Sequence, residues 1–526
     1  MVWQRHLLFA IAAPAETGKL PSVWQAVPDS GPGLPDLPSP TQETYPMKLL
    51  ATLSLGFFLA NALVAEPVGL RKTLLLDSTL IESSENIRIA VGQPEKYSGN
   101  PLFGEDRPWE PRFDNMYPNV IRDESDGLYK CWYNPFLVEV EDWLGSTNER
   151  KRWLYPRQSG LCYAVSKDGI HWEKPNFEIL PFRGQPSNIL MRDVHGVGVF
   201  RDARETDPGK RYKSIFVNQV EGRRTTVAVT FSADGIHWGP QTVLSNVKLM
   251  ADTHNNALWA PTLKRYVAFT RDWDPREWKR NSKGEIPAVR LVSRIESEDF
   301  EHWSDPRTVL RGVNDNMQVY AMPVFYYAGI YLGLPVIIDA KDDRTHAELA
   351  WSKDTIDWHR VDIGTPLIPN SEKKGDYDWG CAYPAAVPLF TKEGIKLYYA
   401  GSDGLHFGER KAYFALATLR PDGFAAATPA DATKAGKIVS MPVAFQEDDG
   451  LLLTADVEPG GSVQVALLDG KGHVVARSAP MTGSFSERAV DWKNPSSRPK
   501  GELRLSFTLS HARLYSYDIV SQKQSK

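Results

Sequence analysis

The chain has 526 residues, a hydrophobic content of 42% and a formal net charge of −4 at neutral pH. That length is too great for one ordinary domain, and the charge gives no reason to expect nucleic acid or an anionic membrane as a partner. Aromatic residues make up 11% of the sequence, which suits flat ligands such as sugar rings and is equally typical of aromatic-rich β structure.

The first 65 residues are expected to lie outside the folded domains. Residues 47–67, MKLLATLSLGFFLANALVAEP, place a lysine before an apolar run and small residues after it, which is the layout of a secretory signal peptide. Residues 1–46 are Pro-rich and patternless, so we interpret Met47 as the true start. The apolar run is short for a membrane span, and a membrane tether is the alternative. We therefore expect a mature protein that begins near Glu66, is secreted or periplasmic, and has no membrane attachment after cleavage.

A short motif with Ser, Asp and Trp recurs along the middle of the chain. The copies are GLCYAVSKDGIHW (160–172), TTVAVTFSADGIHW (225–238), VRLVSRIESEDFEHW (289–303), HAELAWSKDTIDW (346–358) and a weaker KAYFALATLRPDGF (411–424). Their anchors, Ser166, Ser232, Ser297, Ser352 and Arg420, are separated by 66, 65, 55 and 68 residues. Repetition at this spacing indicates five similar structural units.

Each copy is typical of a β-hairpin. Asp168 can accept backbone N–H groups inside the turn, Gly169 allows a positive φ, and Trp172 can fill the gap between neighbouring sheets; the second copy has the same residues. We interpret these motif residues as structural. Two further strands precede each hairpin, so each unit has four strands, and five such units predict a five-bladed β-propeller over residues 66–425.

The composition changes after the fifth copy. AAATPADATKAG is a small-residue linker, and period-two strands separated by Gly-rich turns follow it. Residues 426–526 are therefore predicted to form a C-terminal β-sandwich with no active site of its own.

Three cysteines, Cys131, Cys162 and Cys381, are too few for a disulfide framework, and their spacing matches no metal-binding motif. We expect them to be buried and unpaired.

Several segments resemble the propeller domain of glycoside hydrolase family 32 and its relatives in family 43. The resemblance rests on DNMYPNVIRDESDGLYKCWYN (114–134), YAMPVFYYAGIYLGLP (320–335), AELAWSKDTIDWHR (347–360) and LRPDGF (419–424). It implies hydrolysis of a glycosidic bond by a pair of carboxyl groups, one donating a proton and one activating water or attacking the sugar. The Asn-Asp-Pro-Asn motif of family 32 is absent, which favours the alternative of a carbohydrate-binding propeller without catalysis.

The Ser-x-Asp turn is also similar to the Asp-box of sialidases. In this sequence Asp and Gly are adjacent, whereas the sialidase motif usually has a residue between them. The sequence also shows no evident set of three arginines for a sialic acid carboxylate. A sialidase-like exo-glycosidase is therefore the less favoured alternative.

Three carboxylates are predicted to be catalytic. Asp114 precedes the innermost strand of the first unit, where the related families keep a base or nucleophile, and Asp252 stands at the equivalent place in the third unit. Glu348 is out of pattern, because the other repeats have small or apolar residues four positions before their anchor. Burial would raise the pKa of such a Glu, as a general acid requires, unless it pairs with Arg344 or Arg360.

Weaker candidates for substrate binding lie at the starts of other predicted inner strands. They are Asp193, His195, His254, Asn255, Gln318, Tyr320, Asp378 and Trp379. Each has a structural alternative as a turn cap or a satisfied core residue. We expect no metal and no cofactor, although the resemblance allows a calcium ion on the propeller axis that no motif supports.

The sequence thus predicts an all-β, two-domain glycoside hydrolase acting on a plant, algal or microbial oligosaccharide or polysaccharide. Asp114 would serve as base or nucleophile, Glu348 as acid, and Asp252 would assist. The expected partner is a carbohydrate substrate.

Overall fold

The computed structural model describes residues 71–137, 158–220, 224–274, 288–407, 410–446, 448–493 and 500–521. The predicted signal peptide and Met47 lie outside these residues. All of these residues belong to one compact unit within residues 69–526. The described residues form an all-β structure whose helical elements are two short 3₁₀ turns, η1 (Ser78–Leu80) and η2 (Pro208–Lys210).

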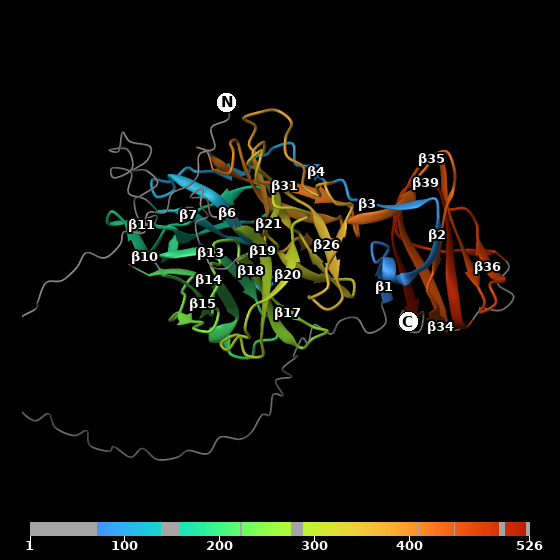
Figure 1. The fold of residues 1–526 in the computed structure, drawn as a ribbon, viewed down its shortest axis with the longest axis horizontal. Coiled ribbons are helices and arrows are strands. Elements are labelled where there is room, and N and C mark those ends of the chain that lie inside the picture. Colours follow the sequence, from blue (N-terminus) through green and yellow to red (C-terminus); the bar gives the residue numbers. More distant parts are fainter. Residues whose placement is uncertain are drawn as a thin grey trace, which may run out of the picture. The chain divides into compact units, whose positions relative to one another are not determined.

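The sheets of the larger region have a propeller-like arrangement, and Figure 1 shows them as a group distinct from the sheet that contains β35 and β39. The first three sheets each hold strands that follow one another along the chain. The first sheet contains β6 (Arg112–Arg122), β7 (Tyr129–Phe136), β8 (Gly160–Ser166), β9 (Trp172–Glu173) and β12 (Ile189–Arg192). The second contains β13 (Val194–Arg201), β14 (Tyr212–Val220), β15 (Arg224–Ser232) and β16 (Thr242–Val243). The third contains β17 (Asn256–Ala260), β18 (Arg265–Asp274), β19 (Val289–Ser297) and β20 (Arg307–Arg311). A separate two-stranded ribbon joins β10 (Phe177–Phe182) and β11 (Gln185–Ser187).

The strands of the next two sheets alternate along the chain. One contains β22 (Val324–Tyr327), β23 (Ile330–Gly333), β26 (Leu349–Ser352) and β27 (His359–Val361). The other contains β21 (Met317–Ala321), β24 (Val336–Asp339), β25 (Arg344–Ala347), β28 (Cys381–Pro384), β29 (Leu389–Phe390), β30 (Ile395–Ser402), β31 (Ala412–Leu419), β4 (Glu95–Lys96) and β5 (Phe103–Gly104). Because β4 and β5 pair with β31, residues from before the first sheet complete the last one.

The C-terminal sheet has its own apolar core, which includes Phe507, Leu505 and Val465. Its strands are β1 (Arg71–Leu74), β2 (Ile81–Glu85), β3 (Ile87–Val91), β32 (Ala425–Pro429), β33 (Gly436–Ser440), β34 (Val443–Phe445), β35 (Asp449–Leu468), β36 (Val474–Ser478), β37 (Phe485–Ala489), β38 (Trp492–Lys493) and β39 (Gly501–Ser521). Residues 71–91, which the sequence interpretation assigned to the propeller, pair instead with these strands. Antiparallel pairing satisfies their backbone groups there.

The repeated turns have the structural role that the sequence predicts. In the second copy, Asp234 Oδ1 accepts the backbone N–H groups of Ile236 and His237 at 2.8 Å. The residue after Asp has a positive φ in four copies, at Gly169, Gly235, Phe300 and Thr355. The last two show that the turn imposes this conformation even where Gly is absent.

Each turn also receives a side chain from a neighbouring sheet. Trp132 Nε1 donates to the carbonyl oxygen of Gly235 at 2.6 Å, and Tyr398 Oη donates to that of Gly169 at 2.8 Å. Trp172 packs edge-on against Tyr398 at a centroid distance of 5.9 Å. The turns therefore join adjacent sheets, as the motif predicts.

Asparagine side chains join the first strands of neighbouring sheets. Asn119 of β6 accepts the N–H of Val199 and donates to the carbonyl of Val197, both on β13. Asn256 of β17 accepts the N–H of Val324 on β22 and donates to the carbonyl of Ala386 after β28. These buried hydrogen bonds hold β6 next to β13 and β17 next to β22, and the candidate functional site lies beside these strands.

Candidate functional site

Strand β6 enters this region through an irregular segment. Met116 and Tyr117 have φ values of 59° and 45°, and the pairing register of β6 with β7 shifts on both sides of Met116. Positive φ is costly for residues with large side chains, and such strain clusters at functional sites. Tyr117 is 1% exposed, so its surroundings hold it in this conformation.

Tyr117 belongs to a hydrogen-bonded cluster around Tyr320. Asn115 donates from Nδ2 to both Tyr117 Oη and Tyr320 Oη at 2.7 Å. Arg410 donates from Nη2 to Asn115 Oδ1 at 2.8 Å. Tyr383 packs 5.5 Å from the Tyr320 ring, and its hydroxyl lies 2.9 Å from Nδ1 of His406. We call these residues, with Asp252, His195, His254, Arg271, Arg290 and Gln318, the Tyr320 cluster.

An exposed carboxylate and a buried imidazole meet at the edge of the cluster. His195 Nε2 lies 2.9 Å from Oδ1 of Asp252; the side chain of His195 is 8% exposed, whereas that of Asp252 is 62% exposed. The imidazole packs edge-on against Tyr117 and stacks on Phe136, with centroids 5.5 and 6.2 Å apart. An ionised carboxylate only accepts hydrogen bonds, so Nε2–H donates and orients Asp252 toward solvent. A carboxylate held in this way is suited to proton transfer.

Arg271 of β18 links Asp252 to Tyr320. Its guanidinium carbon lies 3.9 Å from the centroid of the Tyr320 ring, and Nε and Nη2 donate to the Tyr320 carbonyl oxygen at 3.2 and 3.1 Å. Its Nη1 lies 4.0 Å from Oδ2 of Asp252. Arg271 is 2% exposed, so its packing holds its positive charge at a fixed place beside the carboxylate of Asp252.

The predicted residues His254, a member of the cluster, and Asn255 are both buried. Burial lowers the pKa of His254 to about 3, so its imidazole is neutral at physiological pH, and its Nε2 lies 3.1 Å from Oδ1 of Asn119. Asn255 is fully buried and donates to the carbonyl oxygen of Gly196 at 2.9 Å. Both residues support the strand entrances.

Gln318 holds the arginine beside Tyr320. Its Oε1 accepts from the backbone N–H and Nη1 of Arg290, at 3.2 and 3.0 Å. The predicted role of Gln318 and Tyr320 in substrate binding stays a prediction.

The assignment of Glu348 as a general acid requires correction. Its carboxylate is 0% exposed and accepts hydrogen bonds from Nε and Nη2 of Arg360, while His346 Nε2 lies 3.2 Å away. Burial tends to raise the pKa of Glu348, but the bonds from His346 and Arg360 outweigh it, so the pKa is lowered. The residue is ionised and lies between β25 and β26, where it pairs with His346 of β25 and Arg360 of β27. The expectation of a raised pKa is wrong, and the alternative of a bridge to Arg360 is confirmed.

Three of the weaker candidates make the contacts described here with residues outside the Tyr320 cluster. Asp378 is buried and pairs with Lys96 Nζ at 2.6 Å, which fastens β4 to the last sheet. Trp379 accepts at its carbonyl oxygen from Arg344. Asp193 is exposed and accepts from Gln158 at 3.2 Å. These contacts explain the residues structurally.

Asp114 lies in strand β6, directly before Asn115, but its side chain is outside the described residues. A carboxyl group that the sequence interpretation missed lies nearby. Glu105 Oε1 accepts the N–H of Phe113 at 2.8 Å and that of Ala412 at 3.2 Å. Burial raises its pKa to about 7 despite these bonds, which brings it into the range of a general acid.

The sequence interpretation also missed the arginines of the cluster. Arg271 and Arg290 lie against the Tyr320 ring and Arg410 binds Asn115, although the three are far apart in the sequence and belong to no common motif. The one available signal was Arg271 itself, a charged residue inside the apolar stretch YVAFTRDW. Asn115 and Tyr117 adjoin Asp114 in the quoted segment DNMYPN, but nothing in the sequence reveals their bonds to Tyr320.

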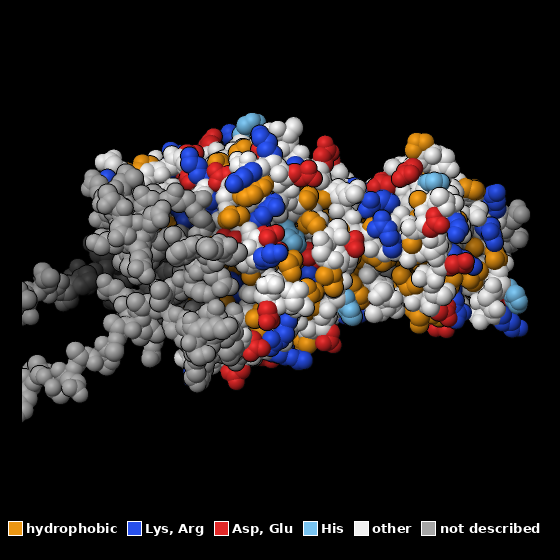
Figure 2. Space-filling view, turned by 45° about the horizontal axis from the view of Figure 1, so that its top comes forward, with side chains coloured by type: hydrophobic (Ala, Val, Ile, Leu, Met, Phe, Trp, Pro, Cys, Tyr) orange, Lys and Arg blue, Asp and Glu red, His pale blue; other side chains and the backbone are white. Residues whose placement is uncertain are grey.

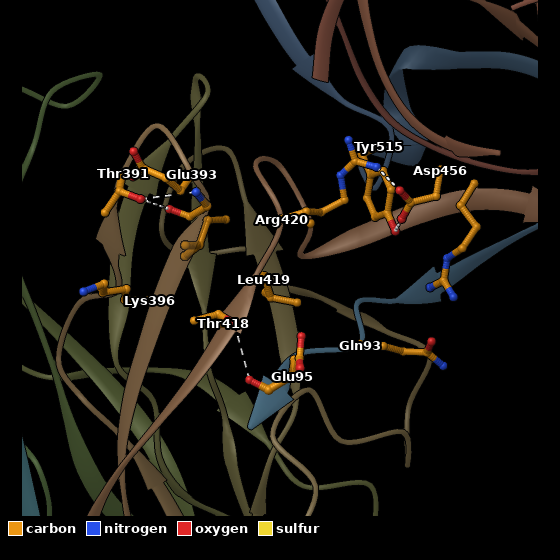
Figure 3. Close-up of a pocket in the computed structure, with 14 residues that line it drawn as sticks. Gln93, Glu95, Thr391, Glu393, Lys396, Thr418, Leu419, Arg420, Asp456 and Tyr515 are labelled. Atoms are coloured by element: carbon orange, nitrogen blue, oxygen red, sulfur yellow. Dashed lines mark hydrogen bonds and ion pairs between the residues drawn. The ribbon is translucent and has the colours of Figure 1, made fainter. Parts of the chain in front are cut away.

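A groove lies elsewhere, between the last propeller sheet and the C-terminal sheet. Figure 3 shows Glu95, Lys396, Arg420, Asp456 and Tyr515 among its lining residues. Arg420 pairs with Asp456, and Tyr515 donates to Asp456 at 2.7 Å, so these polar groups bind one another. They stabilise the contact between the two regions.

The described residues contain no group of three or more His, Cys, Asp or Glu side chains placed to hold a metal ion. The three cysteines are buried and unpaired, as expected. Within the same ranges, no helix has the length and hydropathy needed to cross a membrane. On the face drawn in Figure 2, basic and acidic side chains of the described residues intermingle.

No family model and no curated protein matches the sequence. The structure is distantly similar to solved glycan-active propeller proteins. An N-acetylgalactosamine deacetylase from F. plautii, solved with blood group B trisaccharide, is 15% identical, with 64% of this chain and 96% of that chain covered and a TM-score of 0.42. A glycosyl hydrolase from Bacteroides ovatus is 14% identical over 62% and 94%, at a TM-score of 0.41. A structure from work on glycoside hydrolases of family 130 is 15% identical over 62% and 94%, at 0.41.

Proposed function

We propose that this chain is a glycoside hydrolase built on a five-bladed propeller, with a C-terminal β-sandwich. We also propose that it is secreted or periplasmic and that its substrate is an oligosaccharide or polysaccharide. The observation that carries the proposal is the pair of His195 and Asp252, which presents a carboxylate to solvent beside Arg271 and the aromatic rings of Tyr117 and Tyr320.

Glycosidic hydrolysis needs one group that donates a proton to the leaving oxygen and a second that activates water or attacks the anomeric carbon. Asp252 lies beside His195 and Arg271 and is assigned the second role. Asp114 and Glu105 are the candidates for the first. Glu105 has the appropriate pKa of about 7, and Asp114 precedes the strained segment of β6.

The proposal is tested by a screen of plant, algal and microbial oligosaccharides with the wild type and Asp252→Asn. Asn keeps the shape of the side chain and removes its charge, so we expect kcat/KM to fall by about 10²- to 10⁴-fold. Asp193→Asn is the matched control, because Asp193 is an exposed Asp directly before β13, the strand of His195, and pairs only with Gln158 among the described residues. Full activity of Asp252→Asn would overturn the assignment. Glu105→Gln and Asp114→Asn then identify the proton donor.

A carbohydrate-binding propeller without catalysis is the second candidate. It is favoured by one observation: among the described side chains of the Tyr320 cluster, Asp252 is the sole carboxylate. A wild type that binds an oligosaccharide of the screen and cleaves none of them supports this function and rejects the hydrolase.

A further inference from the structure

Two arginines lie side by side next to Tyr320. The guanidinium carbons of Arg271 and Arg290 are 3.9 and 5.7 Å from the centroid of its ring. Arg290 is also 4.8 Å from the ring centroid of Trp273 and 5.9 Å from that of Phe407. Aromatic faces hold a guanidinium in place by stacking and cation–π attraction, while its N–H edge stays available for planar oxyanions.

The charges of this pair are poorly balanced. Among the described residues, Asp252 is the carboxylate within ion-pair distance of Arg271, at 4.0 Å, and none lies within 4.0 Å of Arg290. Burial, and then the charge of Arg271, lower the pKa of Arg290 to about 10, so both groups remain protonated at neutral pH. Asp252, which is 62% exposed, is thus the carboxylate within ion-pair distance of either cation among the described residues, and Asp343 interacts with Arg290 at longer range.

Arg290 also has an unused donor. Its Nη1 donates to Gln318 Oε1 at 3.0 Å, but its Nε is buried and has no hydrogen-bond partner among the described residues. A buried donor without an acceptor costs about 1–3 kcal/mol, and a bound oxyanion would remove that cost together with part of the repulsion between the two arginines.

The position of the two arginines indicates which molecule would carry such an oxyanion. Asp252, the proposed catalytic carboxylate, lies 4.0 Å from Nη1 of Arg271, so an anion bound by the arginines would sit within one sugar ring of the reacting atoms. Phe407, beside Arg290, is 46% exposed and offers an apolar surface to the ring that carries the charge.

We propose that Arg271 and Arg290 form an oxyanion subsite that selects an acidic sugar, one bearing a carboxylate or sulfate group, as the residue bound next to Asp252. This inference rests on the proposed function, because it names the substrate class of the same site. Inorganic phosphate has the same charge chemistry and is the other source of an oxyanion there.

The subsite is tested by binding measurements with uronic acid and sulfated oligosaccharides, each compared with its carboxyl-reduced or desulfated counterpart. We expect at least one acidic member to bind roughly 10- to 100-fold more tightly than its neutral counterpart. Arg290→Gln should abolish this preference. Arg311→Gln should keep it, since Arg311 is an exposed arginine on β20 of the same sheet, paired with Asp274 at 2.6 Å. Equal affinities for all acidic and neutral pairs, or equal effects of the two variants, would overturn the subsite.

Two further arms separate the alternatives. Inorganic phosphate is titrated into the wild type and Arg290→Gln; phosphate-dependent cleavage of a neutral oligosaccharide would assign the subsite to free phosphate and reject an acidic sugar. Preferential binding of an acidic oligosaccharide without any cleavage supports the subsite and rejects the hydrolase. If Arg290→Gln does not fold, Arg290→Lys keeps the charge but loses the planar fork, and the acidic preference is expected to fall at least several-fold.

Discussion

The repeated turns and the strand entrances obey different rules. At the turns, the same chemistry recurs, with Ser and Asp capping the backbone and an aromatic side chain from an adjacent sheet docking on the Gly235 turn. The Tyr320 cluster instead takes different residues from four sheets, among them Tyr117 of β6, His195 of β13, Arg271 of β18 and Tyr320 of β21. Repetition therefore marks what holds the sheets together, and the proposed site lies where the repeats differ.

Glu348 shows the limit of that rule. It departs from the repeat pattern as clearly as any residue, yet its carboxylate pairs with Arg360 of β27 and His346 of β25. A departure from the pattern thus indicates a special environment, and only the position of the side chain distinguishes catalysis from packing.

Removing the charge of Glu348 is expected to have the largest effect on stability. Glu348→Gln leaves the guanidinium of Arg360 buried without its carboxylate, so we expect a loss of about 3–5 kcal/mol in the free energy of unfolding. Glu82→Gln, which removes the exposed partner of Arg504, should cost less than about 1 kcal/mol. Chemical denaturation measures both. A stable Glu348→Gln protein that has lost activity would return Glu348 to the catalytic site.

The repeated turn is tested at Gly235. A Cβ there would lie 2.6 Å from Cζ2 of the buried Trp132, and the φ of 78° adds strain, so Gly235→Ala should lose about 3 kcal/mol of stability while glycan binding is retained. Gly184→Ala is the matched control, since its φ is 76° and a Cβ meets nothing within 4 Å. A loss of about 1 kcal/mol is expected there. Equal losses would show that Trp132 does not dock on the turn.

A smaller effect is expected from His254 at the base of the cluster. Its pKa is about 3 in the folded protein and about 6.5 when unfolded, so the unfolded chain binds the proton first and stability falls as pH falls from 6.5 toward 3. Between pH 6.5 and pH 5 the loss is about 2 kcal/mol. His254→Gln should lack this component when denaturation is compared at the two pH values. The same acid loss in both proteins would contradict neutral burial of His254.

Local patterns predicted much of the fold. The Asp-Gly turns, the buried cysteines and the strands around them follow from residues adjacent in sequence. The sequence also named Asp252, His195 and Tyr320, and their contact with a substrate stays a prediction. Arg271, Arg290 and Arg410 could not be foreseen, because their significance arises from contacts between strands far apart in the chain. The pairing of residues 71–91 with the C-terminal sheet was missed for the same reason.

The central claim is that the chemistry lies at Asp252 and not at Glu348. It is tested most directly by measuring kcat/KM of Asp252→Asn and Glu348→Gln with one substrate, at a temperature where both are folded. The account predicts a fall of about 100-fold or more for Asp252→Asn and a change of less than about threefold for Glu348→Gln. The opposite order would contradict it.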